Sequence, residues 1–238
     1  MGCGAIPSEQ PWYAKPSYRV PGLRSWDKSH LCLHCWHQWS EKPVLRYLAR
    51  PDGNFLLAVA GTVTGPILVS VLSAMKYHGV RGLAWPLSQV ALRGLRVAVK
   101  QGGEVDGLVT VPLHPTRLRF RGFNHAELLA RLLAKQSGLP LCCSVVRRCR
   151  RTSQQAKLPA GSSARLTNVQ AAFRANRATS SRANRVGLVD DLITSGATVQ
   201  AVTAALTAAG WQVPWAVSVG ATLPPGPESD LDSSVYQP

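Results

Sequence analysis

Acidic residues are scarce in this chain: 12 Asp and Glu stand against 27 Lys and Arg, which gives a formal net charge of +15 and an isoelectric point near 10.3. Such a balance is unusual for a protein that acts on a small metabolite. It favours contact with nucleic acid, anionic lipid or polyphosphate. A solvated basic surface with a few active-site arginines is the simpler alternative, because charge alone carries no sequence specificity.

Long apolar runs are also lacking. The longest apolar-looking stretch, residues 55–75, is interrupted by Gly61, Thr62, Thr64, Gly65 and Pro66. No segment therefore has the roughly 18 or more uninterrupted apolar residues of a transmembrane helix, and we expect none. The first residues hold no basic stretch followed by an apolar core, so we also expect no secretory signal. Both expectations point to a cytoplasmic protein.

Cysteine is sparse, with six residues in 238, and the spacing excludes a disulfide framework. Cys142 and Cys143 are adjacent, whereas Cys32 and Cys35 have the spacing of metal ligands or of a redox pair. A structural zinc site needs four ligands, and Cys3 is a further candidate. The irregular segment 1–50 is therefore predicted to be either a degenerate zinc module or a segment with reduced thiols and no metal.

From residue 55 onward, apolar patterns of strand and helix period alternate, with no internal repeat. This alternation predicts an α/β domain over residues 55–222, with a mostly parallel sheet flanked by helices. Residues 223–238 are predicted to form a disordered tail. Helices are expected over residues 63–77, 83–100, 124–136 and 196–209. Strands are expected over residues 107–111, 186–190 and 213–219, with shorter ones near 145–146 and 171–174.

The most informative run extends from Val186 to Thr198, where an apolar strand, two carboxylates, a small polar loop and a helix start follow one another. A helix N-terminus offers unpaired N–H groups and a positive dipole end to a phosphate. Asp190 and Asp191 can accept hydrogen bonds from ribose hydroxyls. The loop contributes hydroxyl donors and a close backbone approach through Thr194, Ser195, Gly196, Ala197 and Thr198. The run predicts a sugar-phosphate site.

This run resembles the thirteen-residue signature of the type I phosphoribosyltransferases. In that family the strand ends in two acids, and the loop holds the 5′-phosphate of phosphoribosyl pyrophosphate (PRPP). The resemblance implies a type I phosphoribosyltransferase-like fold, PRPP as ligand, Mg²⁺ as its companion ion, and Asp190 and Asp191 as catalytic residues.

A second resemblance covers residues 57 to 220. Val109-Thr-Val-Pro-Leu-His114, then Arg121-Gly-Phe-Asn124, then the later Arg, Thr, Gln and Asn positions resemble the ComF family of competence proteins, which includes GntX-like proteins. It implies a role in DNA uptake during natural transformation, with single-stranded DNA and a competence helicase as partners. It also places a pyrophosphate loop at Pro112, Leu113, His114, Arg117 and Arg121, although a solvated or DNA-facing basic face is an equal alternative for the two arginines.

Some residues keep two interpretations. Arg147, Arg148, Arg150 and Arg151 lie where phosphoribosyltransferases carry a flexible catalytic loop, and four arginines in five residues can equally follow a nucleic-acid backbone. Lys76, at a predicted helix end, is either a ligand contact or an ordinary C-terminal lysine.

Asn124 has a structural interpretation first, because Glu127 follows it by three residues in a capping-box-like pair at the start of a predicted helix.

Two functions from different classes therefore remain open. One is an enzyme that transfers the phosphoribosyl group of PRPP to an acceptor or hydrolyses it. The other is a non-catalytic competence factor that binds single-stranded DNA and uses the fold as a scaffold. A fold shared by enzymes and regulators cannot decide between them.

Overall fold

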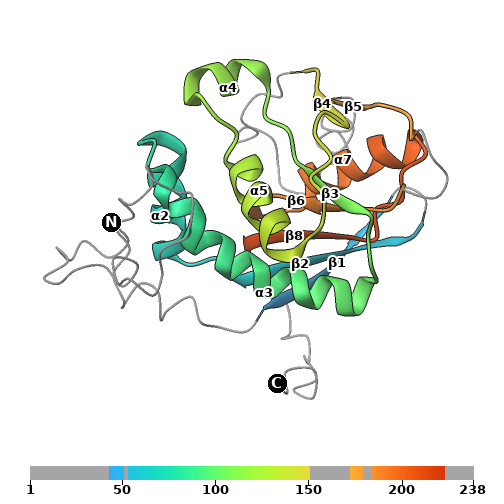
Figure 1. Ribbon diagram of the computed structural model, residues 1–238, viewed down its shortest axis with the longest axis horizontal. Helices are drawn as coiled ribbons and strands as arrows, with labels where there is room; N and C mark the ends of the chain where they lie inside the picture. The colour runs from blue at the N-terminus through green and yellow to red at the C-terminus, as the bar shows by residue number, and fades with distance from the viewer. Residues whose placement is uncertain (1–42, 51–52, 151–171, 179–183, 223–238) are drawn as a thin grey trace, which may run out of the picture.

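A central sheet of mostly parallel strands organises the molecule (Figure 1). The computed structural model describes residues 43–50, 53–150, 172–178 and 184–222. The strand order is β1-β2-β8-β6-β3, with the short β7 also pairing with β8. β1 is antiparallel to β2, and the other pairs are parallel. The strands are β1 (Val44–Ala49), β2 (Phe55–Val63), β3 (Gly107–Thr110), β6 (Val186–Val189), β7 (Leu192–Ile193) and β8 (Trp215–Ala221).

Helices cover both faces of this sheet. They are α2 (Pro66–Tyr77), the short 3₁₀ turn η3 (Arg81–Leu83), α3 (Ala84–Gly102), α4 (Pro115–Arg121), α5 (His125–Ser137) and α7 (Ala197–Ala208). α2, α3 and α5 share one core with Val59 and Val217, while α7 shares the other with Ala58 and Ala216. Adjacent strand residues enter opposite cores because side chains alternate across a strand. The predicted α/β class with a mostly parallel, helix-flanked sheet is confirmed.

The hairpin of β1 and β2 was not predicted. Residues 1–50 were expected to be irregular, which is wrong for Val44–Ala49, and a helix was expected from residue 63, whereas α2 begins at Pro66. Residues 56–62 are buried throughout, and a continuous apolar run does not distinguish strand from helix by its period. Pro66 starts the helix where its missing N–H would have no helical partner. The rest of the predicted segment 1–50, and the tail 223–238, lie outside the described residues.

A second, two-stranded sheet stands beside α7. β4 (Val146–Arg148) pairs antiparallel with β5 (Phe173–Ala175), and both strands contact α7. The short strands predicted near these positions are therefore confirmed. A long loop is expected from the sequence over Arg147–Ser163, which is wrong for Arg147 and Arg148, because both belong to β4. The part of that segment beyond Arg150 lies outside the described residues.

Within the described ranges, none of the helices has both the length and the apolar composition that crossing a bilayer requires.

Candidate functional site

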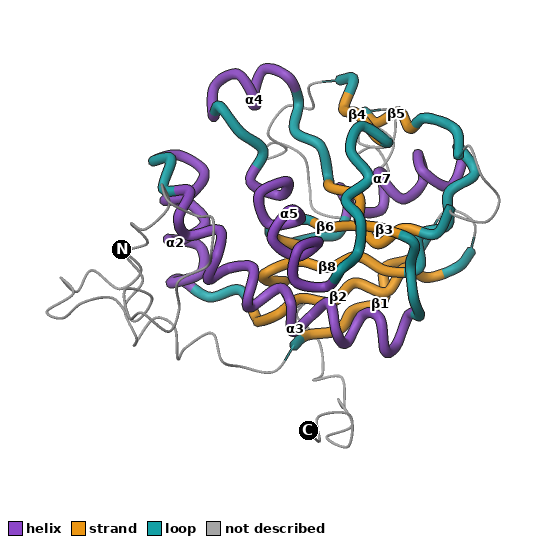
Figure 2. Tube along the Cα trace, in the orientation of Figure 1, coloured by secondary structure: helices purple, strands orange, loops and turns teal. Residues whose placement is uncertain are grey.

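The two loops singled out in the sequence lie at the same edge of the sheet. β3 and β6 are parallel neighbours, and the Val111 N–H donates to the Val189 carbonyl oxygen at 3.0 Å, just where both strands end. Asp190 and Asp191 follow β6 directly, and Pro112–His114 lead from β3 into α4, as the loop in Figure 2 shows. The carboxyl ends of parallel strands are where open α/β sheets bind ligands.

Asp191 is buried in an ion-pair network from two helix ends. Its Oδ2 contacts Lys76 Nζ from the last turn of α2, and lies 3.4 Å from His125 Nε2 at the start of α5. Burial alone would raise the pKa of Asp191. The hydrogen bond from His125 and the charge of Lys76 outweigh it and hold the pKa well below its usual range. Asp191 therefore anchors α2 and α5 to the end of β6.

Asp190 has the opposite environment, although it is adjacent in the chain. Its side chain is partly exposed, and its Oδ1 accepts a hydrogen bond from the Asp191 N–H at 2.9 Å. Desolvation and the neighbouring Asp191 charge raise the pKa of Asp190 well above its ordinary value. A carboxyl group in this position is stabilised as an anion by an added cation, so Asp190 is the acid available to a ligand or metal ion.

The loop after the two acids has a left-handed turn that only glycine takes easily. Gly196 has φ +79 and forms the N-cap of α7, whose first turn contains Ala197 and Thr198. An added Cβ at Gly196 would lie 2.7 Å from Leu48 Cδ1, so the loop packs directly on β1. Ser195 Oγ accepts from the Ala197 N–H at 3.4 Å. Apart from that contact, the loop presents its small polar side chains at the surface.

Arg46 of β1 holds the same loop in place through hydrogen bonds. Its guanidinium donates to the carbonyl oxygens of Thr194 and Thr222, each at 2.7 Å. The hairpin that the sequence did not reveal therefore supports the predicted phosphate loop through both Arg46 and Leu48. No local pattern signals this role, because Arg46 lies 148 positions before Thr194.

The loop after β3 is built differently. His114, predicted in the pyrophosphate group, caps α4, because its Nδ1 accepts from the Thr116 N–H at 3.2 Å. Pro112 and Leu113 are partly exposed, and α4 itself has no buried residue. α4 thus extends away from the sheet edge (Figure 1).

Asn124 joins this region to the core. Its Oδ1 accepts from the Ala126 N–H at 3.1 Å, which confirms it as the N-cap of α5, and its Nδ2 donates to the Val111 carbonyl oxygen at 3.2 Å. The reciprocal capping-box bond does not form, because Glu127 pairs instead with Arg131.

The predicted basic residues separate into distinct environments. Arg121 lies 3.4 Å, NH1 to Nδ1, from His125, and its guanidinium stacks 4.9 Å from the Tyr77 ring centroid, so it extends the Asp191 network. Arg117 is partly exposed on α4. Arg148 is half-buried over the Phe173 ring, at 5.2 Å from the centroid.

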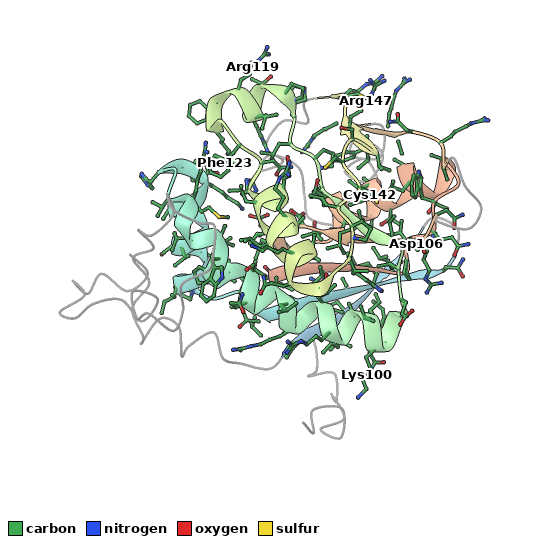
Figure 3. All side chains as sticks on the ribbon, viewed as in Figure 1. Lys100, Asp106, Arg119, Phe123, Cys142 and Arg147 are labelled. Atoms are coloured by element: carbon green, nitrogen blue, oxygen red, sulfur yellow. The ribbon has the colours of Figure 1, made fainter. Side chains whose placement is uncertain are left out.

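The other described arginines of the cluster are more exposed than Arg148. Arg147 and Arg150 are exposed, and Figure 3 shows Arg147 at the rim of the molecule. Arg151 lies outside the described residues. The cluster, predicted to be either part of a catalytic loop or a nucleic-acid surface, is thus divided within β4, where Arg147 is exposed and Arg148 is half-buried.

Two metal ions were predicted from the sequence, zinc at the cysteines of the N-terminal segment and Mg²⁺ together with the sugar phosphate. Within the described ranges, no group of three or more His, Cys, Asp or Glu side chains could hold a metal ion. Cys3, Cys32 and Cys35 lie outside those ranges, so zinc stays a prediction. One carboxylate beside a phosphate loop suits Mg²⁺, which proteins commonly hold through one or two carboxylates and the substrate's own phosphates. Asp190 meets that requirement.

His125 is the contact that the sequence reasoning missed. The signal in the sequence was its position at the start of a predicted helix, four residues before Leu129 on the apolar face. The structure then shows that it is 4% exposed at the first turn of α5. A buried histidine usually has a polar partner, and here that partner is Asp191. Lys76, left open between two interpretations, contacts the same carboxylate.

Comparison with curated proteins finds a distant relative. The chain is 28% identical over 190 residues to competence protein F of Haemophilus influenzae, and the alignment covers 74% of this chain and 80% of that protein. No protein-family model matches the chain.

Proposed function

We propose that this chain is a ComF-like protein that binds PRPP, or a closely related sugar phosphate, together with Mg²⁺. The observation that carries the proposal is the edge where β6 ends in Asp190 and Asp191 and turns through Gly196 into α7, next to the loop after β3. A phosphate at a helix N-terminus, a ribose at a carboxylate and a second anionic group near arginines fit this order of donors.

The geometry suggests how the ligand parts are distributed. The N-terminus of α7, with the hydroxyls of Thr194, Ser195 and Thr198, suits the 5′-phosphate. Asp190 suits the ribose hydroxyls or the bound Mg²⁺. Asp191, paired with Lys76 and His125, positions the loop and does not itself offer a free carboxylate. This division refines the expectation that both acids contact the ribose.

The reaction class follows from the ligand. When bound, Mg²⁺ would neutralise charge on the departing pyrophosphate during pentosyl transfer, as metal ions do in phosphate sites. The similarity to competence protein F supports a role in natural competence. We propose DNA uptake as the process and a competence helicase as a partner on the ComF resemblance of the sequence alone.

Isothermal titration calorimetry with Mg²⁺-PRPP tests the proposal. Wild-type protein should bind, and Asp190→Asn should weaken binding tenfold or more, which is about 1.4 kcal/mol. Glu104→Gln is the matched control, because Glu104 is an exposed carboxylate beyond α3, before the amino end of β3. It should bind like the wild type. Absence of wild-type binding would overturn the proposal.

A second candidate function is binding of single-stranded DNA at α4. Phe120 is 82% exposed, the most exposed large apolar side chain among the described residues, and it lies between Arg119 and Arg121. Leu118 on the same helix is also exposed. An exposed ring on which bases can stack, flanked by arginines that contact phosphates, is a common way of holding single strands.

Fluorescence anisotropy with a labelled oligonucleotide tests this candidate at two salt concentrations. Binding should weaken as salt rises, because phosphate contacts release counterions. Phe120→Ala should reduce affinity about tenfold by removing a stacked base contact. Tyr47→Ala is the control, since Tyr47 is also exposed but lies on β1. Binding that is absent or insensitive to salt would exclude this function.

A further inference from the structure

We propose that a groove between α3 and α5 binds the acidic C-terminal segment of this same chain, residues 223–238. The inference does not depend on the proposed function. Glu104 and Val105, which line the groove, directly precede β3, so the groove lies toward the amino end of that strand, whereas the candidate site lies at its carboxyl end. Three features support the proposal: the chemistry of the groove, the composition of the segment, and the place where the segment leaves the sheet.

The groove has an apolar floor between the two helices. Its volume is about 560 Å³, within the roughly 300–1,000 Å³ that ligand-binding clefts commonly have. Most of its lining side chains are apolar and come from α3, from the start of β3 and from the end of α5. They are Leu92, Leu95, Val99, Val105 and Leu139, joined at the rim by Arg96, Glu104, Gln136 and Ser137.

The rim of the groove along α3 is basic. This helix carries Arg93, Arg96 and Lys100 and no acidic residue. Arg96 and Lys100 are one helical turn apart and exposed, and neither side chain has a hydrogen bond or ion pair with any described residue. Figure 3 shows Lys100 at the edge of the molecule. Glu104, at the far end of the groove, opposes an anion there, so an acidic occupant is best placed beside Arg96.

The C-terminal segment has the complementary composition. Residues 223–238 contain Glu228, Asp230 and Asp232 and no Lys or Arg, although the whole chain has a net charge of +15. Leu231 stands between the two aspartates. An apolar side chain flanked by carboxylates matches an apolar floor with cations at its rim, because both the apolar burial and the charges are then complementary. We therefore assign Leu231 to the floor and the two aspartates to the rim.

The attachment of the segment brings it within reach of the groove. Gly94 of α3 packs on β8, since an added Cβ there would lie 3.2 Å from Val217 Cγ2, and Arg96 follows two positions later. The strand from Val217 to Thr222 covers roughly 17 Å. Asp232 lies ten positions after Thr222, which gives it a reach of roughly 33 Å. A tethered segment also acts at an effective concentration on the order of millimolar, so modest contacts are sufficient to hold it.

A seated segment would change which basic surface is open to nucleic acid. α3 and α4 lie at opposite sides of the molecule (Figure 1). Carboxylates beside Arg96 and Lys100 neutralise charge that would otherwise attract a phosphate backbone. The arginines of α4 are then the more available ones, which agrees with α4 as the surface for the second candidate function.

Carbodiimide crosslinking of the full chain, read by mass spectrometry, tests the proposal. The reagent joins an amine to a carboxylate that touches it, so Lys100 should be linked to Asp230 or Asp232. Lys135 is the internal control, because it is an exposed lysine in the last turn of α5, one turn after Arg131 and outside the lining of the groove. The link at Lys100 should exceed that at Lys135 about tenfold and fall steeply as salt rises.

Three variants separate the groove from a diffuse attraction between charges. Arg96→Glu should lower the yield of the Lys100 link about tenfold, because it reverses the rim charge next to the aspartates. Leu231→Ser keeps every charge and should still lower the yield about fivefold, because it removes the side chain assigned to the apolar floor. Arg174→Glu is the matched control on exposed β5, and its yield should stay within about twofold of the wild type.

A mixture of isotope-labelled and unlabelled protein shows which chain supplies the carboxylate. Links within one chain support the proposal, whereas links between labelled and unlabelled chains would show that the segment docks on a second copy and would overturn it. Equal yields at Lys100 and Lys135 at low salt, or no link at Lys100, would also overturn it. An unchanged yield in Arg96→Glu or in Leu231→Ser would exclude the groove as the place of contact.

Discussion

The loops after β6 and β3 leave neighbouring parallel strands at one edge of the sheet, yet they are held very differently. The loop after β6 is fixed from three sides: Asp191 pairs with Lys76 and His125, Arg46 holds the Thr194 carbonyl, and Gly196 packs on Leu48. The loop after β3 is tied mainly through Asn124 and continues into α4, which buries no residue. The loop after β6 is thus held by several tertiary contacts, whereas α4 has little packing against the rest of the described residues.

The largest expected effect on stability comes from removing the ion pair between Lys76 and Asp191, which helps to hold the loop after β6. Lys76→Met should destabilise the fold by about 3 kcal/mol, because it removes the main partner of a buried carboxylate. Because folding lowers the pKa of Asp191, its ion pairs stabilise the protein when the pH is above about 4, the ordinary pKa of an aspartate. This stabilisation is lost as the pH falls and the carboxylate becomes protonated. The difference between variant and wild type should therefore shrink as pH falls.

Chemical denaturation at several pH values measures this effect. Lys100→Met provides the control, since Lys100 is an exposed lysine in the last turn of α3, and its replacement should change stability by less than about 0.5 kcal/mol. Equal effects of the two substitutions would show that the Asp191 network does not hold the loop.

Gly196→Ala should have the next largest effect, about 2 kcal/mol with loss of PRPP binding, because a side chain is strained at φ +79 and would also meet Leu48. Gly138→Ala separates the two causes. Gly138 has φ +76 at the end of α5 and open space around its Cβ, so it should cost only about 1 kcal/mol. Thermal unfolding and calorimetry measure both. Similar costs would mean that the packing on β1 is unimportant.

Asp190→Asn should stabilise the ligand-free protein by about 1 kcal/mol at neutral pH, in the direction opposite to Lys76→Met. Because folding raises the pKa of Asp190, the wild-type protein becomes less stable as the pH rises above the ordinary pKa of an aspartate. The gain should therefore appear above about pH 4 and be absent in stronger acid. Denaturation across this range checks it, and a destabilised Asp190→Asn would contradict the view that desolvation and the Asp191 charge disfavour the Asp190 anion in the ligand-free protein.

The smallest effect on stability is expected on α4. Phe120→Ala should change the free energy of unfolding by less than about 0.5 kcal/mol, because the ring is 82% exposed. Phe123→Ala, three residues later, should cost about 3 kcal/mol, since that ring is 9% exposed and packs beneath Arg81. A large loss with Phe120→Ala would show that α4 is held by the core after all, and the contrast between the two loops would then fail.

Much of the candidate site could be predicted from the sequence because its residues are close together in the chain. The strand, the two acids, the glycine turn and the helix start follow within residues 186–198, so their spacing already implies their arrangement. Asn124 was recognised as an N-cap for the same reason. The hairpin of β1 and β2 was missed because its buried run resembles a helix as much as a strand, and its role depends on pairing with β8 across 158 positions of the chain, from Leu57 to Trp215.

The sequence by itself determined the α/β class, the order of strand, acids, glycine turn and helix over residues 186–198, and the excess of positive charge. Only the tertiary structure decided that Asp191 is the buried, paired acid and Asp190 the partly exposed one, because that depends on Lys76 and His125 converging on Asp191 from separate helices. It also divided the arginine cluster, leaving Arg147 exposed and Arg148 half-buried. Spacing along a chain specifies local geometry, but burial and charge pairing arise where distant segments pack together.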